Sequence, residues 1–347
     1  MARNGERRPP TIRDVAQRAG VSVSTVSAVL TGRKPVSPAL RARVEQAMAE
    51  LRYRPSLLAR ALQTRRTESL ALLVPSLANP FFTGLLRAVE QTAHAHGYSV
   101  FVGSTEGDPA KVAFYRDRLL AMGVDGVLLV LSWDIVSQGV AGSLLAEGVP
   151  VVGVAGARIV PEIDCFVSDD VEAGRVAGRY LLGLGHRRIA FVGALDSETT
   201  ALRYQGLAEA LDAAGVSADE RLLVRARGYG EDDGYAAVTE LLLRAVPFTA
   251  VVAFNDVMAL GVLNALEDQG LEVPGRVSVV GFDDTTSAYA RPKMTTVACP
   301  KETIGARGVA RLLERIRGEG PERPEVVRLP VSLVVRASTR TPPAARP

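Results

Sequence analysis

From residue 69 onward, the chain alternates continuous runs of Val, Ile and Leu with segments that repeat apolar residues at helical spacing. Strands buried on both faces produce such runs, and helices that cover a sheet produce the intervening pattern. The pattern therefore predicts the parallel sheets of an α/β protein. The expected strands are residues 70–75, 99–103, 126–131, 149–155, 188–193, 222–227, 250–254 and 277–282.

Eight such strands fit two doubly wound lobes better than one sheet, with the division near residues 163–166. Strand-like segments at 294–297 and 326–336 flank a helical pattern at 301–317, so the chain is expected to return to the first lobe and cross again. This is the architecture of the periplasmic binding proteins, in which a ligand lies between the lobes. We expect a first lobe of residues 68–163 plus 295–322, a second lobe of residues 164–294 plus 323–338, and a disordered tail of residues 339–347.

The first 54 residues carry a helical pattern instead. A T-x-x-D capping box begins a helix at Thr11, Gly20 permits a sharp turn, and Ser22 is placed to cap a second helix. Ser37 and Pro38 are typical of the start of a third helix. The apolar residues of the first two helices share one inward face: Ile12, Val15, Ala16, Ala19, Val26, Val29 and Leu30. The pattern predicts a helix-turn-helix head in residues 1–54.

The second helix keeps a small and mostly polar outer face. A surface of this size is thin enough to enter the major groove of DNA. An ordinary helical hairpin with a solvated Ser/Thr face would show the same pattern. The outward residues are Val23, Ser24, Thr25, Ser27 and Ala28.

Residues 55–67 form a short leucine-rich link after this head. Ser56 can cap a helix that ends near Leu62, but so short a helix is unstable alone. Its leucines need a partner, which is a symmetry mate, the body of the protein, or DNA.

Charge separates the head from the rest of the chain. Residues 1–66 hold 14 Lys/Arg against 4 Asp/Glu, a net charge of +10, whereas the other residues hold 27 against 34, a net charge of −7. This asymmetry is typical of a nucleic-acid-binding module on a body that does not bind nucleic acid. A disordered basic tail is the alternative, but the apolar periodicity of the head argues against it.

The composition narrows the class of protein further. A chain of 347 residues with 47% hydrophobic content predicts two or three units with sizeable cores. No apolar run approaches a membrane span and no signal peptide is evident, so we expect a cytoplasmic protein without a membrane partner. Cys165 and Cys299 are expected to be free thiols, and their spacing, with only three histidines in the chain, predicts neither a metal site nor a cofactor.

Polar and aromatic side chains follow strand after strand of the predicted sheets. Ligands in open α/β sheets bind at the carboxyl ends of strands, so this recurrence favours a binding site for a small polar ligand with an apolar face. Taken singly, Phe81 and Phe82 fit the core equally well, and Asn255 or Asp283 could cap a helix. The candidate ligand contacts are Phe81, Phe82, Trp133, Arg203, Tyr229, Asn255 and Asp283.

The segments DVAQRAGVSVSTVSAVL (14–30) and YRPSLLARAL (53–62) resemble the DNA-binding head of the LacI/GalR family of bacterial transcriptional regulators, and the similarity continues along nearly the whole chain. The resemblance implies a homodimeric, ligand-responsive repressor that binds an inverted-repeat operator. It also implies a hinge helix within 55–67 that orders on the operator, pairs with its twin and drives Leu62 into the minor groove.

The resemblance assigns roles to single residues. In the recognition helix it implies that Ser22, Thr25 and Ser27 contact phosphates while Val23, Ser24 and Ala28 face base edges. The remaining predicted DNA contacts are Thr11, Ser56, Ala59 and Arg60. Within the motifs NPFF, VAFND and VVGFDD, and at the matching single positions, it implies effector contacts by Phe81, Phe82, Arg203, Tyr229, Asn255 and Asp283.

Two positions depart from the family pattern. Ala155 stands after the fourth strand, where many relatives have an acidic residue that binds a sugar hydroxyl, so the effector is expected to be a sugar or another small polar metabolite. Ala28 stands where many relatives have arginine, the usual reader of guanine, so direct base readout is expected to be poor in hydrogen bonds. The final residues lack leucine heptads, which predicts a dimer rather than a tetramer.

Two other classes of function fit the sequence less well than a regulator does. An α/β enzyme is disfavoured because no strand is followed by G-x-G-x-x-G or G-x-x-x-x-G-K-[ST], G-x-S-x-G is absent, and the histidines lack nucleophile partners. A cytoplasmic binding protein that only sequesters its ligand would leave the basic head without a purpose. We therefore expect a ligand-responsive transcriptional regulator with no catalytic residues.

Overall fold

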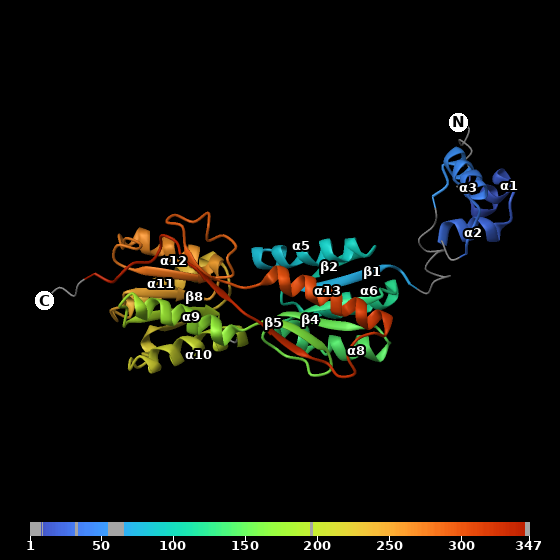
Figure 1. Ribbon diagram of the computed structural model, residues 1–347. Coiled ribbons are helices and arrows are strands. Elements are labelled where there is room, and N and C mark those ends of the chain that lie inside the picture. The colour runs from blue at the N-terminus through green and yellow to red at the C-terminus, as the bar shows by residue number, and fades with distance from the viewer. Residues whose placement is uncertain (1–7, 9, 32–33, 55–65, 195–196, 344–347) are drawn as a thin grey trace, which may run out of the picture. The chain divides into compact units, whose positions relative to one another are not determined.

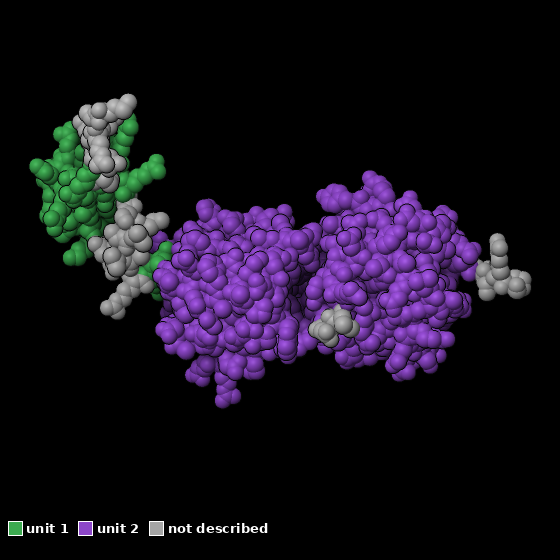
Figure 2. Space-filling view, turned by 180° about the vertical axis from the view of Figure 1, so that it is seen from behind, with its two compact units in different colours: residues 1–67 green, residues 68–347 purple. Residues whose placement is uncertain are grey.

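A computed structural model describes residues 8, 10–31, 34–54, 66–194 and 197–343. The chain forms two compact units, residues 1–67 and residues 68–347, which Figure 2 shows in green and purple. Each unit is described by itself. Among the described residues, no helix is both long and apolar enough to cross a lipid bilayer.

The first unit is a three-helix bundle made of α1 (Ile12–Ala19), α2 (Val23–Thr31) and α3 (Pro38–Leu51). The Thr11 amide donates to Asp14 Oδ2 (2.7 Å), which satisfies a free N–H at the start of α1. Gly20 ends α1 with a φ of 62°, a left-handed conformation that glycine adopts without strain. The buried core contains Val15, Ala16, Ala19, Val26, Val29, Val44 and Ala47, so the predicted helix-turn-helix is confirmed.

The second unit contains two sheets, each covered by helices on both faces (Figure 1). Among the described residues, the first sheet is six-stranded and parallel, in the order β11-β5-β4-β3-β1-β2. Its strands are β1 (Ser69–Val74), β2 (Ser99–Ser104), β3 (Gly126–Leu131), β4 (Val151–Gly156), β5 (Asp164–Ser168) and β11 (Val326–Leu329). The helices packed around this sheet are α5 (Pro80–Ala95), α6 (Pro109–Met122), α7 (Trp133–Ser137), α8 (Val140–Ala146) and α13 (Lys301–Arg317).

The second sheet, also six-stranded within the described part of the chain, has the order β12-β10-β9-β8-β6-β7, with only β12 antiparallel to its neighbour β10. Its strands are β6 (Ile189–Ala194), β7 (Leu223–Ala226), β8 (Ala250–Ala253), β9 (Ser278–Phe282), β10 (Thr295–Ala298) and β12 (Ser332–Val334). Its helices are α9 (Asp170–Gly183), α10 (Glu198–Ala213), α11 (Glu231–Leu243) and α12 (Asp256–Asp268), with a short 3-10 turn at Glu220–Leu222. We call the layers around the first and second sheets the first and second lobe.

The chain passes between the lobes three times, after β5, after β10 and after β11 (Figure 1). The lobe predicted for three strands is therefore wrong. The sequence assigns β5 and β11 to the second lobe, but they pair in the first sheet. It assigns β10 to the first lobe, but β10 pairs in the second sheet. A buried strand has the same apolar pattern whichever sheet it joins, so its sequence cannot identify its neighbour. Salt bridges contribute to this choice, because Asp164 of β5 contacts Arg311 (2.5 Å) and Arg315 (2.7 Å) of α13.

The predicted disordered tail is also wrong at its start. The Tyr180 and Thr339 hydroxyls are 2.7 Å apart, and the Arg340 carbonyl oxygen lies 2.9 Å from His186 Nε2. Ser278 Oγ donates to the same carbonyl oxygen (3.1 Å). These contacts hold residues 339 and 340 against the second lobe, although a polar, Pro-rich segment gives no periodic signal of such contacts. Residues 344–347 lie outside the described part of the chain.

Candidate functional site

The amino end of α2 forms a compact group of hydroxyls. Ser22 Oγ accepts from the Thr25 amide (3.1 Å) and lies 2.7 Å from Ser24 Oγ and 2.9 Å from Thr25 Oγ1. Ser22 is therefore the predicted N-cap of α2. Val23 and Ser24 are exposed at this helix end, whereas Thr25, Ser27 and Ala28 are half-buried. The amide groups and hydroxyls at a helix amino end suit an anion such as a phosphate.

The arginines of the first unit differ in how they are held. Arg43 donates to the carbonyl oxygens of Ala19 (2.7 Å) and Gly20 (3.3 Å), so it stabilises the turn between α1 and α2. Arg18 pairs with Glu50 at 2.5 Å. Arg52 and Arg54 are exposed at the end of α3. The predicted hinge contacts Ser56, Ala59, Arg60 and Leu62 lie outside the described residues.

In the second unit, the predicted effector residues lie near the carboxyl ends of the strands. Figure 2 shows a recess between the two lobes of this unit. Asn79 caps α5 by accepting from the Phe81 amide (2.9 Å). Phe81 is buried in the core of the first lobe, and Phe82 is half-buried with its ring edge-on to Phe81 at 5.3 Å. Phe81 therefore packs in the core, which is the alternative to a ligand contact that its sequence position also allowed.

Arg203 is the centre of a buried cluster in the second lobe and is 5% exposed. Its Nε donates to Asp170 Oδ1 (2.9 Å) and its Nη1 to the Phe254 carbonyl oxygen (2.5 Å). Its Nη2 lies 3.5 Å from Asp283 Oδ1 and 3.7 Å from Cys299 Sγ. Protein groups thus contact every nitrogen of this guanidinium.

Helix packing places Arg203 beside its partner. A Cβ on Gly174 of α9 would lie 1.8 Å from the Arg203 carbonyl oxygen, so only glycine allows α10 to approach α9 this closely. The guanidinium then packs between the rings of Phe254 (5.0 Å) and Phe282 (4.6 Å). Burial raises the pKa of the Asp170 and Asp283 carboxyls, and Arg203 opposes this rise by stabilising their charged forms.

Three further predicted effector residues lie beside the Arg203 cluster: Asn255, Tyr229 and Asp283. Asn255 Oδ1 accepts from the Met258 amide (2.7 Å) and caps α12, while its Nδ2 donates to the Tyr229 carbonyl oxygen (3.2 Å). The Tyr229 side chain is 50% exposed. Asp283 has a φ of 97°, a conformation that costs an L-residue energy and often occurs at functional sites. Lys301 Nζ donates to its carbonyl oxygen (2.9 Å).

Trp133 does not join this cluster. It is 63% exposed at the start of α7, and the guanidinium of Arg158 lies over its ring at 3.9 Å. Arg158 also pairs with Glu198 of the second lobe (3.2 Å). The candidate contacts predicted from the sequence do not include Asp170, Arg158 or Glu198. Each lies near the carboxyl end of a strand, so the rule that gave the other candidates could have included them.

Asp256 is a further buried carboxyl, and it is not among the candidate contacts predicted from the sequence. Its Oδ1 accepts from the Thr296 hydroxyl (2.7 Å) and its Oδ2 from the Thr285 amide (2.6 Å). Burial, and then the charge of Asp283, raise the pKa of Asp256 to about 6. Asp256 therefore gains a proton at a higher pH in the folded protein than in the unfolded chain.

This difference predicts a pH dependence of stability. Between the ordinary pKa of 3.8 and about 6, the folded state holds a proton at Asp256 that the unfolded state has released. The stabilisation is complete below the unfolded pKa and is lost as pH rises through the folded pKa, by up to about 3 kcal/mol. We expect the half-unfolding urea concentration to fall between about pH 4 and pH 7, and Asp256→Asn to reduce this fall.

The matched control is Asp212→Asn, which changes an exposed carboxyl on α10. It should keep the wild-type pH dependence. If Asp256→Asn also kept it, Asp256 would not be the titrating group.

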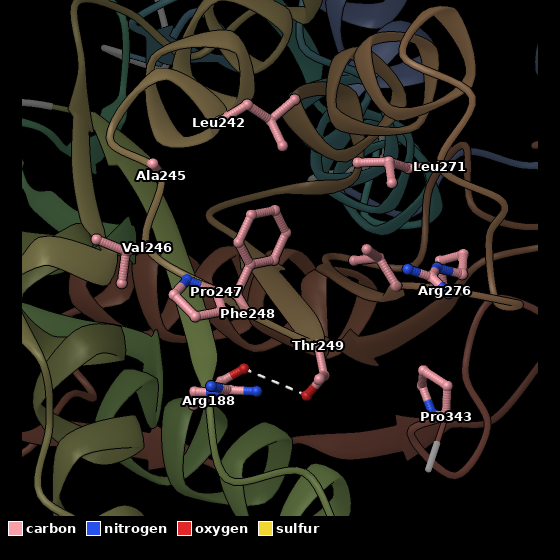
Figure 3. Close-up of a pocket in the computed structure, with 11 residues that line it drawn as sticks. Arg188, Leu242, Ala245, Val246, Pro247, Phe248, Thr249, Leu271, Arg276 and Pro343 are labelled. Atoms are coloured by element: carbon pink, nitrogen blue, oxygen red, sulfur yellow. Dashed lines mark hydrogen bonds between the residues drawn. The ribbon is translucent and has the colours of Figure 1, made fainter. Parts of the chain in front are cut away.

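A separate cavity of about 430 Å³ lies at the amino ends of strands in the second sheet. Figure 3 shows Phe248, Leu242 and Leu271 on its apolar side and Arg188 and Arg276 at its edges. The Thr249 hydroxyl donates to the Arg188 carbonyl oxygen (3.4 Å). Its lining contains none of the predicted effector residues. Elsewhere in the described residues, no cluster of His, Cys, Asp and Glu is arranged to hold a metal ion.

Two family profiles match the chain. The profile for bacterial regulatory proteins of the lacI family matches residues 11–56, and the profile for a periplasmic binding protein-like domain matches residues 179–339. The HTH-type transcriptional repressor PurR of Histophilus somni is 33% identical over 336 residues, which cover 95% of this chain and 99% of that relative.

Solved structures are similar over the same length. The lac repressor dimer bound to operator and the anti-inducer ONPF aligns with a TM-score of 0.85 and 29% identity, covering 96% of this chain and 100% of that one. A complex of the transcriptional regulator CelR with cellobiose aligns with a TM-score of 0.72 and 35% identity, covering 95% of this chain and 99% of that one.

Proposed function

The chain belongs to the lacI family of bacterial regulatory proteins, and from this premise we propose how its residues bind an operator and respond to an effector. It is a ligand-responsive, DNA-binding transcriptional repressor and not an enzyme. We propose that residues 1–54 are its DNA-binding head and residues 55–67 its hinge. Because a bacterial operator lies in the cytoplasm, we propose that the protein acts there.

The recognition helix is α2. Its amino end, with the Ser22 cap and exposed Val23 and Ser24, is the observation that carries the DNA-binding proposal. We assign phosphate contacts to Ser22, Thr25 and Ser27, and contacts with base edges to Val23, Ser24 and Ala28. Thr11 adds a contact at the start of α1. The net charge of +10 in residues 1–66 supplies the long-range attraction to DNA.

In this proposal two copies of the chain bind an inverted-repeat operator. The similar lac repressor structure, a dimer bound to operator, supports binding by two copies. The hinge residues Ser56, Ala59 and Arg60 contact the DNA, and Leu62 from each copy enters the minor groove at the centre. A wedge of this kind unstacks a base step and bends the duplex. Specificity then depends on how easily the central step deforms.

The effector binds between the lobes, as a small polar metabolite that includes the sugar class. Trp133, Tyr229 and Phe82 supply aromatic surface, since they are exposed or half-buried. Phe81, Arg203, Asn255 and Asp283 are buried and form the walls behind that surface. Effector binding changes the angle between the lobes, and this change alters hinge pairing and operator affinity.

A binding scan over single-base operator variants tests this assignment. Because Val23, Ser24 and Ala28 cannot make bidentate contacts with bases, central substitutions should cost at least as much as substitutions under α2, about 1–3 kcal/mol each. Leu62→Ala should weaken specific binding far more than non-specific binding. Ala28→Arg should add a preference for guanine in each half-site.

The operator is first obtained by selection from random duplexes with the wild-type protein. A wild-type profile that tolerates every central substitution, together with an unchanged profile for Leu62→Ala, would show that the hinge is only a linker. Failure of the selection to enrich any site would contradict operator binding itself.

A further inference from the structure

The first lobe presents a cation stacked on an aromatic ring where it contacts the second lobe. Arg158 follows β4, Trp133 follows β3, and the guanidinium carbon lies 3.9 Å from the centre of the indole ring. Stacking fixes the plane of a guanidinium while its edges stay able to donate hydrogen bonds. The pair thus resembles a flat platform with cationic donors at its rim.

The protein itself supplies one carboxylate to this platform. Arg158 Nη2 lies 3.2 Å from Glu198 Oε1, and Glu198 is the first residue of α10 in the second lobe. Both side chains are partly exposed, and ion pairs of that kind contribute little stability. A ligand anion that binds Arg158 better could therefore replace Glu198 and break a contact between the lobes.

The second terminal nitrogen of Arg158 is unsatisfied. Its Nη1 is buried and has no hydrogen-bond partner among the described residues. Glu198 thus meets only one of the two terminal nitrogens, whereas an oxyanion can bind both in the fork geometry that favours arginine. A buried guanidinium nitrogen without a partner is costly, so a ligand that reaches it when Glu198 is displaced would gain from satisfying it.

Asp134, the carboxylate next to Trp133 in the sequence, is held by two hydroxyl groups. Asp134 accepts from the Ser132 hydroxyl (2.6 Å) and the Thr105 hydroxyl (2.5 Å). Ala155, at the end of β4, adds no charge. The first lobe therefore meets a ligand here with a cation and not with an acidic group.

We propose that the effector of this protein carries an anionic oxyacid group, a carboxylate or a phosphate, which binds the Arg158 guanidinium on the Trp133 ring and displaces Glu198. This inference rests on the proposed effector site between the lobes. It assigns Arg158 as the residue that selects an acidic ligand. It also assigns the Arg158–Glu198 pair as the contact through which binding changes the relation of the two lobes.

Fluorescence tests this proposal at the site itself, because Trp133 is the only tryptophan in the sequence. The full chain is titrated at constant pH and ionic strength with acids and matched neutral compounds: gluconate against glucose, glucose 6-phosphate against glucose, and benzoate against benzamide. We expect an acid to change the Trp133 spectrum saturably and its neutral partner to bind at least about tenfold more weakly, the ratio for about 1.4 kcal/mol. The carboxylate and phosphate arms separate the two sources of the anion.

Four variants separate the roles of the two side chains. Arg158→Gln should weaken the acid at least about tenfold and remove the preference over its neutral partner. Arg158→Lys keeps the positive charge but cannot bind both oxygens of an oxyanion as arginine does. Its affinity for the acid should lie between those of the wild type and Arg158→Gln. Glu198→Gln should tighten acid binding severalfold, because a competing carboxylate is gone. Arg188→Gln, which changes an arginine at the amino ends of the strands, should match the wild type.

Several outcomes overturn the proposal: a panel in which no acid affects Trp133, neutral compounds that bind as well as acids, or Arg158→Gln with wild-type binding. Weaker acid binding in Glu198→Gln would mean that Glu198 supports the ligand and would also overturn it. Operator binding without effector is measured in parallel. A protein that binds its operator but prefers neutral ligands disproves only the acidic effector, whereas loss of operator binding in the wild type disproves the proposed function.

Discussion

Operator affinity is expected to fall by about 10³–10⁵ when the salt concentration rises from about 50 to about 200 mM, if the dimer neutralises some 6–10 phosphates. The physical reason is the release of condensed counterions by the basic head, whose residues 1–66 carry a net charge of +10. Binding isotherms over a series of salt concentrations give the slope of the logarithm of the binding constant against the logarithm of the salt concentration. A nearly flat dependence would count decisively against DNA binding by this head.

Variants can assign that slope to particular arginines. Arg52→Gln removes an exposed charge at the end of α3 and should lower the slope by about 1 if Arg52 contacts a phosphate. Arg188→Gln removes the same charge from the second unit and should leave the slope unchanged. Arg43 is unsuited to this test, because its hydrogen bonds to Ala19 and Gly20 hold the helix turn and its loss would disturb the fold.

Arg203→Ala is expected to destabilise the second unit by about 3–5 kcal/mol, the range for removing one partner of a buried ion pair. The change leaves Asp170 and Asp283 buried without their shared cation and frees the Phe254 carbonyl oxygen. Both carboxyls already have raised pKa values, so in the variant they must either stay charged at high cost or take up protons. The loss of stability should therefore be larger at about pH 8 than at about pH 5.

Urea unfolding of the full chain at the two pH values measures this effect. Arg225→Ala, which removes an exposed arginine from β7, is the matched control and should change stability by less than about 0.5 kcal/mol. Wild-type stability in Arg203→Ala would mean that the cluster is not a structural ion pair. The sequence alone predicts a different main result for this substitution, weaker effector binding with little change in operator affinity in the absence of effector.

The sequence by itself determined the local structure and the class of the protein. Caps such as Thr11, Ser22 and Asn79, and the turn glycine Gly20, act within a few residues of themselves, so their signals are local and the observed helices begin and end near them. The apolar periods predicted α/β lobes and a helix-turn-helix head, and both are present. The motifs that resemble the LacI/GalR family agree with the relatives that the chain matches.

Tertiary structure alone decided which distant segments meet. The sheets assigned β5, β10 and β11 to the opposite lobes from those predicted, because strands buried on both faces look alike in sequence. Enclosure turned Arg203 from a candidate ligand contact into the centre of a buried ion cluster, and raised the pKa of Asp256 to about 6. Arg158 meets Trp133 only in the folded first lobe, and it meets Glu198 only after both lobes have formed. Desolvation, pairing across sheets and charge neighbours depend on distances in space, and no local pattern of residues encodes those distances.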